Sequence, residues 1–127
     1  MNDKRKATQD LVVLIIGRKP LEWRIPKTEG IPPGERICAT LDYFEEAHLL
    51  VLYGGRDDKR YSYNDIWVMD LERFAWLRVS VYDLEPSQRS EHCSLIWANK
   101  YIVFGGMNKN DYYIGSDIYE ITLGKVF

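Results

Sequence analysis

The sequence has 127 residues, of which 46% are hydrophobic and 13% aromatic, and this excludes a disordered chain and permits one small folded β domain. Its formal net charge of -2 lacks the basic surplus of a nucleic-acid-binding protein. The longest apolar run, residues 11–16, is too short for a membrane-spanning helix and no secretory signal is found, so we expect a cytoplasmic protein without nucleic-acid or membrane partners.

Taken in chain order, the sequence opens on a polar, basic stretch, residues 1–9, which predicts a solvated tail. Its cluster Lys4–Arg5–Lys6 leaves a targeting or phosphate-binding element as the alternative. From residue 10 onward the apolar residues form short runs without a helical stripe, which is typical of strands. These runs predict strands at residues 10–14, 23–25, 37–43, 48–54, 65–71, 76–82, 91–97, 101–105 and 117–123.

Several motifs occur twice in the chain, at a period of about 53 residues. The separation is 53 residues for Trp23 and Trp76, 53 for Arg36 and Arg89, 51 for Gly54 and Gly105, and 52 for Asp65 and Asp117. Small differences of this kind are expected where surface loops change length. Four short strands in a repeat of about 50 residues predict the blade of a β-propeller.

The combined motif resembles that of the kelch-repeat family. The resemblance is carried by an arginine after a proline turn (Arg36, Arg89), a double glycine closing the second strand (Gly54–Gly55, Gly105–Gly106), an Asp-aliphatic-aromatic stretch (Asp65–Ile66–Trp67, Asp117–Ile118–Tyr119) and a tryptophan in the fourth strand (Trp23, Trp76). His92 also fits the Arg-x-x-His pattern of the family. The first repeat departs from this pattern, because Ala39 stands at the equivalent place.

This resemblance implies an all-β segment of a kelch-type β-propeller with four-stranded antiparallel blades, whose strands are lettered A to D from the innermost outward. The strand order is C-D, A-B-C-D, A-B-C, with residues 10–32 in the first blade, 33–85 in a complete blade and 86–127 in the next. That is about two and a quarter blades, whereas closed propellers have about four to eight. We therefore expect other chain segments or subunits to complete the ring, and poor solubility for this segment alone.

Most of the repeated residues have a structural explanation. The glycine pairs 54–55 and 105–106 permit backbone conformations that a side chain would block, and no helix start follows them that would make a phosphate cradle. We expect the recurring aromatic residues Trp23, Trp67, Trp76 and Tyr119 to pack between strands and blades. The two cysteines, Cys38 and Cys93, are expected to be free, buried thiols.

Catalysis finds little support in the sequence. His48 and His92 belong to different repeats, and neither lies at a metal-ligand spacing from cysteine or carboxylate residues. No nucleophile motif is found. We therefore expect no catalytic residue, no metal and no cofactor.

The connections between strands B and C, and those between strands D and A, are expected on one face of the propeller. The two B–C connections are rich in tyrosine, arginine and asparagine, which are residue types that make adaptable protein contacts. The candidate partner-binding residues are Arg36, Arg56, Asp58, Arg60, Tyr61, Tyr63, Arg89, Lys109, Asn110, Tyr112 and Tyr113. Tyrosines folded back on the blade, in loops that are merely solvated, are the alternative.

Arg36 and Arg89 have two interpretations. A guanidinium with five fixed donors suits a tie between one blade and its neighbour, with Glu35, Glu91 or the neighbouring blade's backbone carbonyls as partners, and this structural interpretation is preferred. The same geometry suits an acidic peptide, which is the alternative. The family resemblance implies a noncatalytic protein-interaction scaffold, with cytoskeletal or ciliary association among its settings. The alternatives are an enzyme or a sugar- or small-molecule-binding propeller with its site at the central channel, and a segment that only contributes blades.

Overall fold

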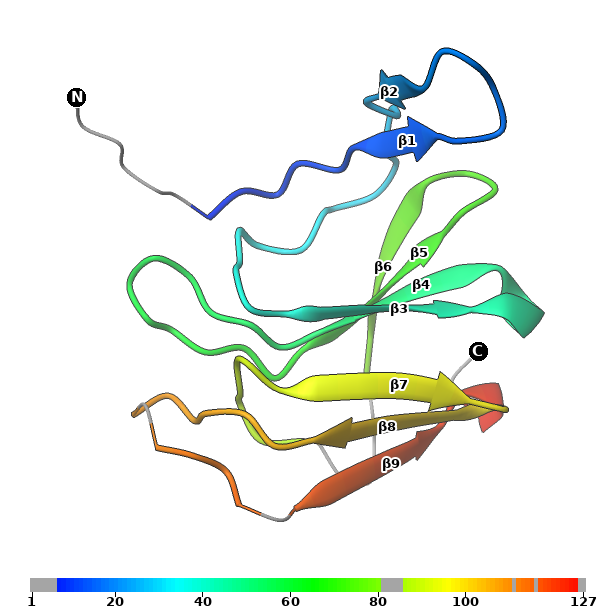
Figure 1. The fold of residues 1–127 in the computed structure, drawn as a ribbon. Coiled ribbons are helices and arrows are strands. Elements are labelled where there is room, and N and C mark those ends of the chain that lie inside the picture. The colour runs from blue at the N-terminus through cyan, green and yellow to red at the C-terminus, as the bar shows by residue number, and fades with distance from the viewer. Residues whose placement is uncertain (1–6, 81–85, 111, 116, 126–127) are drawn as a thin grey trace, which may run out of the picture.

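The computed structural model describes residues 7–80, 86–110, 112–115 and 117–125, and in these ranges the chain is built from β-strands and two short 3-10 turns (Figure 1). The strands are β1 Val13–Ile15, β2 Glu22–Arg24, β3 Thr40–Phe44, β4 Leu49–Tyr53, β5 Ile66–Asp70, β6 Ala75–Val79, β7 Cys93–Trp97, β8 Lys100–Phe104 and β9 Ile118–Thr122. The turns are η1 Glu45–Ala47 and η2 Leu123–Lys125.

The strands form three antiparallel sheets in which each strand pairs with the next one along the chain. The sheets have the orders β1-β2, β3-β4-β5-β6 and β7-β8-β9. In Figure 1 they follow one another from top to bottom, as successive blades do. This confirms the predicted fold class and the order C-D, A-B-C-D, A-B-C.

Both strands A begin later than the sequence predicts, at Thr40 and Cys93. The reason is a left-handed residue before each strand, Cys38 with φ 56° and Glu91 with φ 57°. A non-glycine residue in this region interrupts a strand. The end of β6 predicted at Tyr82 lies outside the described residues, which place the last residue of β6 at Val79.

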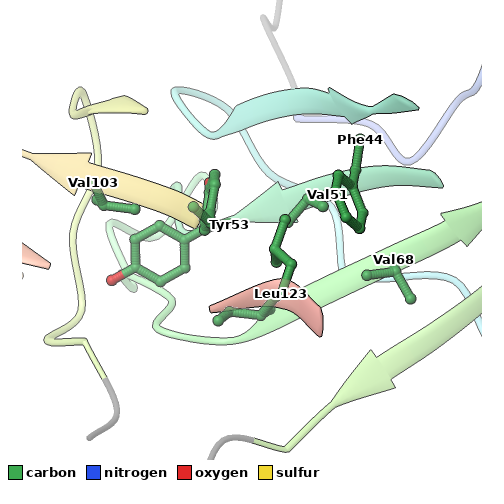
Figure 2. Packing of buried hydrophobic residues seen from close by; sticks show 8 residues of the cluster. Phe44, Val51, Tyr53, Val68, Val103 and Leu123 are labelled. Atoms are coloured by element: carbon green, nitrogen blue, oxygen red, sulfur yellow. The ribbon is translucent and has the colours of Figure 1, made fainter. Parts of the chain in front are cut away.

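The core lies between the complete blade and the blade that follows it. Strand pairing puts Thr40, Asp42 and Phe44 of β3 on one face with Val51 and Tyr53 of β4, because side chains alternate along a strand. This face packs against the sheet of β7–β9, and Figure 2 shows Phe44, Val51, Tyr53 and Val68 in one cluster with Val103 and Leu123. The buried cluster consists of Phe44, Val51, Tyr53, Ile66, Val68, Tyr101, Val103 and Leu123.

Two expectations about burial are wrong. Trp23 lies in a sheet of only two strands and 67% of its surface is exposed, whereas Trp67, Trp76 and Tyr119 are half-buried as packing residues should be. Cys38 and Cys93 are free thiols but are exposed. Cys93 points to the face of β7–β9 that no further sheet covers in the described part of the chain, which explains its exposure.

Candidate interaction face

The connections from strand B to strand C lie on one side of the molecule, together with the segments that lead into β3 and β7 (Figure 1, left). The turns between A and B and between C and D lie on the opposite side. We call the first side the loop face, defined by residues 31–39, 54–65, 86–92, 105–110 and 112–115. The predicted sharing of one face by the two kinds of connection is therefore confirmed for the described residues.

The two B–C loops have the same internal scaffold, which the sequence analysis missed. In the first loop, Oδ1 of Asp57 accepts hydrogen bonds from the backbone N–H groups of Lys59 (2.8 Å) and Tyr61 (2.9 Å). In the second, Oδ1 of Asn108 accepts them from Asn110 (2.9 Å) and Tyr112 (3.1 Å). The available signal was an Asp or Asn at positions 51 residues apart, since both side chains form such turns.

The shared scaffold places an exposed tyrosine at the same point of each loop. Tyr61 is 56% exposed, and its equivalent Tyr112 is 69% exposed. The backbone closes both loops in the same way, because N–H of residue 57 donates to the carbonyl of Tyr61 and N–H of residue 108 to that of Tyr112. In each of the two larger blades, this turn therefore holds an exposed tyrosine at the same position.

The side chains around these two tyrosines differ between the loops. Tyr61 packs edge-on against Tyr63, with 5.2 Å between the ring centroids, and Gln88 lies at 3.5 Å from its hydroxyl. Tyr63 is half-buried, and burial followed by the charge of Asp57 raises its pKa. In the second loop Tyr113 is 86% exposed, and Lys109 and Asn110 are exposed.

The other candidates of the first loop contact neighbouring segments. Arg56 is half-buried and lies 3.9 Å from the carboxylate of Glu91, at the far limit of an ion pair. Asp58 accepts the backbone N–H of Ala7 through both carboxylate oxygens, at 2.9 and 3.1 Å. Arg60 is exposed and has a left-handed backbone, with φ 64°. Ala7, placed in the solvated tail by the sequence, is thus buried against the loop face.

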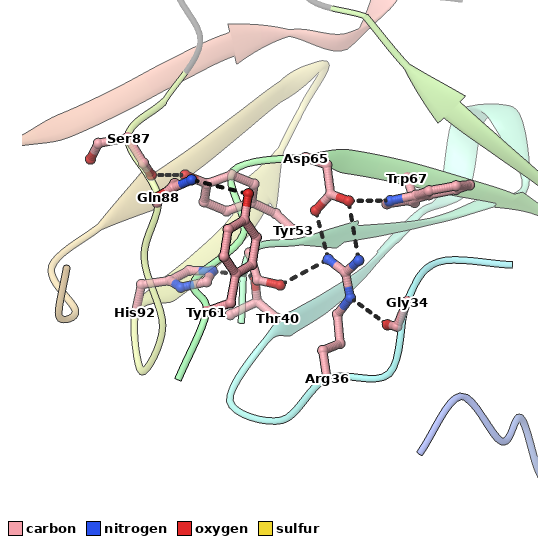
Figure 3. A network of polar contacts seen from close by, with 11 residues as sticks. Gly34, Arg36, Thr40, Tyr53, Tyr61, Asp65, Trp67, Ser87, Gln88 and His92 are labelled. Carbon is pink, nitrogen blue, oxygen red and sulfur yellow. Dashed lines mark hydrogen bonds and ion pairs between the residues drawn. The ribbon is translucent and has the colours of Figure 1, made fainter. Parts of the chain in front are cut away.

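Arg36 is held inside its own blade, as Figure 3 shows. Its guanidinium forms a bidentate ion pair with Asp65, at 2.7 and 3.1 Å, and donates to the carbonyls of Gly34 and Gly54 at 3.0 Å each. The ring of Tyr63 lies beneath it at 4.1 Å. Only 5% of the Arg36 side chain is exposed.

The second carboxylate oxygen of Asp65 also accepts the indole N–H of Trp67 at 2.7 Å. Burial by itself would raise the pKa of Asp65, but the hydrogen bonds from Arg36 and Trp67 and the charges of Arg36 and Arg78 lower it. This ion pair explains two kelch motifs at once, because it joins the arginine before strand A to the Asp-x-Trp stretch of strand C. Glu35, the partner considered from the sequence, is not involved.

Arg89 occupies the equivalent place but has different partners. It is completely buried, donates to the carbonyl of Gly105 at 3.0 Å and to the hydroxyl of Ser87 at 2.8 Å, and lies 4.8 Å from the centre of the Tyr119 ring. Within the described residues no ion pair joins it to Asp117, which is exposed. Neither arginine is available to an acidic peptide, so that interpretation gives way to the structural one.

The tie between blades is made by the backbone of Arg89 and not by its side chain. Its carbonyl accepts the N–H of Gly55 at 2.9 Å, and its N–H donates to the carbonyl of Tyr63 at 3.2 Å. Gly54 is required here, because a Cβ on it would lie 2.7 Å from the Arg89 carbonyl oxygen and 2.7 Å from the His92 ring. The side chains of Arg36 and Arg89 therefore bond within their own blades, while the backbone of Arg89 bonds to the preceding blade.

A polar network links β3 and β7 below this junction. Nε2 of His92 lies 2.9 Å from the hydroxyl of Thr40, which also lies 3.1 Å from the hydroxyl of Tyr101, and Ser94 donates to Asp42. Burial and then the charge of Arg89 lower the pKa of His92 to about 4, and burial raises that of Tyr101 to about 12. This network consists of residues that join the two blades.

The described residues contain no group of three or more histidine, cysteine or acidic residues able to hold a metal ion. No helix among them is both long and apolar enough to cross a membrane. A pocket of about 270 Å³ lies beside the Arg36 ion pair, at the ends of β5 and β6 and not between β3 and β7, and it is lined by Asn64, Asp65, Ile66, Arg78, Val79, Ser80 and Pro86.

Comparison with known proteins agrees with this architecture. Residues 1–126 match the KLHDC2/KLHL20/DRC7 Kelch-repeats domain. The chain is 32% identical to Dynein regulatory complex subunit 7 of Chlamydomonas reinhardtii over 100 residues, which cover 79% of this chain and 8% of that protein. It is 30% identical over 103 residues to Acyl-CoA-binding domain-containing protein 5 of Arabidopsis thaliana, covering 80% of this chain and 16% of the relative.

Human Host cell factor 1 is 32% identical over 111 residues, which cover 83% of this chain and 5% of that protein. The chain thus spans a small part, between 5% and 16%, of the relatives it matches. The strand order and the match over residues 1–126 together show that this chain belongs to the kelch-repeat family.

Proposed function

We propose that this chain is a noncatalytic protein-interaction scaffold that binds a protein partner through its loop face. The observation that carries the proposal is the recurrence of one Asx-stabilised turn in both B–C loops, with exposed Tyr61 and Tyr112 at equivalent points. Tyrosine adds large contact area at low conformational cost, and a fixed turn reduces the entropy lost on binding. Loops that were only solvated would not need this repeated arrangement.

The relatives support the same class of function. One of them is named as a subunit of the dynein regulatory complex, which is an assembly of proteins. A cytoplasmic location with cytoskeletal or ciliary association is therefore part of the proposal. A propeller with a small-molecule site at the central channel has no supporting observation among the described residues, because the pocket lies at the ends of β5 and β6.

The test compares the proteins captured from a cell extract by the wild-type chain and by the double variant Tyr61→Ala, Tyr112→Ala. We expect the double variant to lose its specific partner at least about tenfold, as the loss of two interfacial tyrosines implies. Tyr43→Ala is the matched control, because Tyr43 is 48% exposed and lies at the opposite end of β3.

Circular dichroism spectra and melting midpoints of the variants must match those of the wild type, so that loss of binding is separated from loss of folding. Capture that is unaffected by the double variant would contradict the proposal. Capture that is reduced equally by Tyr43→Ala would place the partner on another surface.

A further inference from the structure

The junction between the two larger blades shows what one blade requires of its neighbour. The face of β3–β6 that carries Phe44, Val51, Tyr53 and Ile66 is covered by β7–β9, and these side chains are at most 5% exposed. Polar contacts at the edge of the same junction join Thr40 to the ring of His92 and Asp42 to Ser94, while Tyr53 donates to the carbonyl of Ser87 at 2.6 Å.

The blade β7–β9 presents the same surface without a cover. Register places Cys93, Phe104 and Ile118 side by side on one face, and Leu95 and Ile102 beside them. The 51- to 53-residue repeat makes Phe104 the equivalent of Tyr53, Ile118 that of Ile66 and Trp97 that of Phe44. We call this face of β7–β9, with Gly105, the docking seat.

Exposure confirms that the docking seat is unfilled in the described part of the chain. Trp97 is 69% exposed, Phe104 41% and Ile118 70%, against 4%, 0% and 5% for their equivalents in the complete blade. A Cβ added to Gly54 would meet the Arg89 carbonyl and the His92 ring at 2.7 Å. A Cβ added to Gly105 would meet nothing within 4 Å, although its φ of 71° is nearly the same as the 66° of Gly54.

The polar positions of the junction have changed in the docking seat. Cys93 stands where the complete blade has Thr40, Leu95 where it has Asp42, and Phe104 where it has Tyr53. The acceptor of the Ser94 hydroxyl, the donor to the Ser87 carbonyl and the hydroxyl partner of His92 are thus replaced by two hydrocarbon side chains and a weakly hydrogen-bonding thiol. A polar group buried against such a surface would lose its partner, which is unfavourable.

In a propeller the docking seat is covered by the innermost strands of a further kelch-type blade, and we propose that the seat selects a blade with apolar residues where β7 has His92 and Ser94. The occupant follows from the junction already present, because the same backbone geometry recurs one repeat later. A second copy of β7–β9 is a poor occupant, since its Ser94 would face Leu95 and its His92 would face Cys93. The repeat therefore specifies where a blade docks, while these three substitutions specify which blade.

The experiment extends the chain by one blade in the same register. Residues 1–122 are followed by a second copy of residues 71–127. Thr122 is the last residue of β9 and pairs with Lys100, just as Asp70 is the last residue of β5 and pairs with Leu49. The copy that begins at residue 71 therefore continues β9 as residue 71 continues β5. The added copy is made unchanged, or apolar with His92→Leu and Ser94→Val. Cys38→Ser in the original chain, and Cys93→Ser in the added copy, leave the seat cysteine as the single thiol.

The measured quantity is the rate at which N-ethylmaleimide labels the seat cysteine, relative to the 127-residue chain carrying Cys38→Ser. We expect the apolar copy to slow labelling at least about tenfold more than the unchanged copy does, because desolvation of unpaired polar groups weakens docking by about that factor. Equal protection by both copies would refute the selectivity, and protection by neither would refute docking.

A reciprocal variant guards against misfolding of the apolar copy. Leu95→Asp in the seat restores the acceptor that Ser94 has in the existing junction, so the unchanged copy should then protect Cys93 better than the apolar copy does. An order of protection that stays the same with Leu95→Asp would overturn the proposal. The loop tyrosines take no part in this measurement, so its outcome is separate from that of the proposed partner binding.

Discussion

Replacing Asp65 with alanine should destabilise the complete blade by about 3–4 kcal/mol. The Arg36 and Asp65 side chains are only 5% and 11% exposed, so removing the carboxylate leaves a cation buried with carbonyl oxygens and the Tyr63 ring as its remaining partners. Breaking a buried ion pair in this way costs about 3–5 kcal/mol. We expect the lower end of that range for Arg36, and about 1 kcal/mol more because Trp67 loses its acceptor.

The matched control is Asp117→Ala, at the equivalent position of the next blade. Asp117 is exposed, and the described residues include no ion pair between it and Arg89, so its loss should cost less than about 1 kcal/mol. Urea unfolding of both variants, followed by tryptophan fluorescence and by circular dichroism, measures the two free energies. Equal losses for the two variants would refute the reasoning, because they would show that burial of the ion pair has no consequence.

Two further predictions concern the junction between the blades. Gly54→Ala should lower the free energy of unfolding by at least about 2 kcal/mol more than Gly105→Ala. Both positions have a positive φ, but only Gly54 is in close contact with Arg89 and His92. Urea unfolding measures the two free energies, and similar losses for the two variants would contradict the prediction. The His92 pKa of about 4 lies below its unfolded value of about 6.5, so the unfolded state binds the proton first. Stability contributed by neutral His92 is present above pH 6.5 and is lost as the pH falls through 4, by about 2 kcal/mol after allowance for solvent screening. The free energies of unfolding of the wild type and of His92→Gln are measured as a function of pH, and the wild type should lose more as the pH falls. Parallel pH profiles for the two proteins would exclude this loss.

The repeat predicted the fold well because blades are built from local pairings. Double glycines 51 residues apart and short apolar runs without a helical stripe were enough to place the strands and their order. The strand starts at Thr40 and Cys93 were misplaced because Cys38 and Glu91 adopt left-handed conformations. Neither residue type indicates such a conformation in a sequence.

Burial was predicted less well because it depends on neighbours that the local pattern does not specify. Trp23 carries the same motif as Trp76, yet it lies in a two-stranded sheet and stays exposed. The network of Thr40, His92 and Tyr101 was also missed, since its members are 52 and 61 residues apart and meet only when two blades pack. The Arg36–Asp65 ion pair was not predicted for the same reason, because the sequence does not show which strand ends lie together.

The loop face was predicted from composition, and the structure supplies its geometry. Tyrosine and charged residues between strands B and C indicated exposed loops, and Tyr61 and Tyr112 are exposed. The turns that hold them could have been predicted from Asp57 and Asn108, which the sequence analysis passed over. For Arg36 and Arg89 the sequence left a structural and a ligand-binding interpretation open, and the structure favours the first because both side chains are part of the interior.

The two Asx turns also separate the shape of each loop from its charge. Asp57 and Asn108 each accept two backbone N–H groups through Oδ1, and an amide and a carboxylate supply that atom equally. Exchanging aspartate and asparagine at either position would therefore alter the electrostatic potential around the tyrosine without moving the tyrosine itself. Such loops can diversify between related chains, and acquire new binding preferences, at little risk to the stability of the blade that carries them.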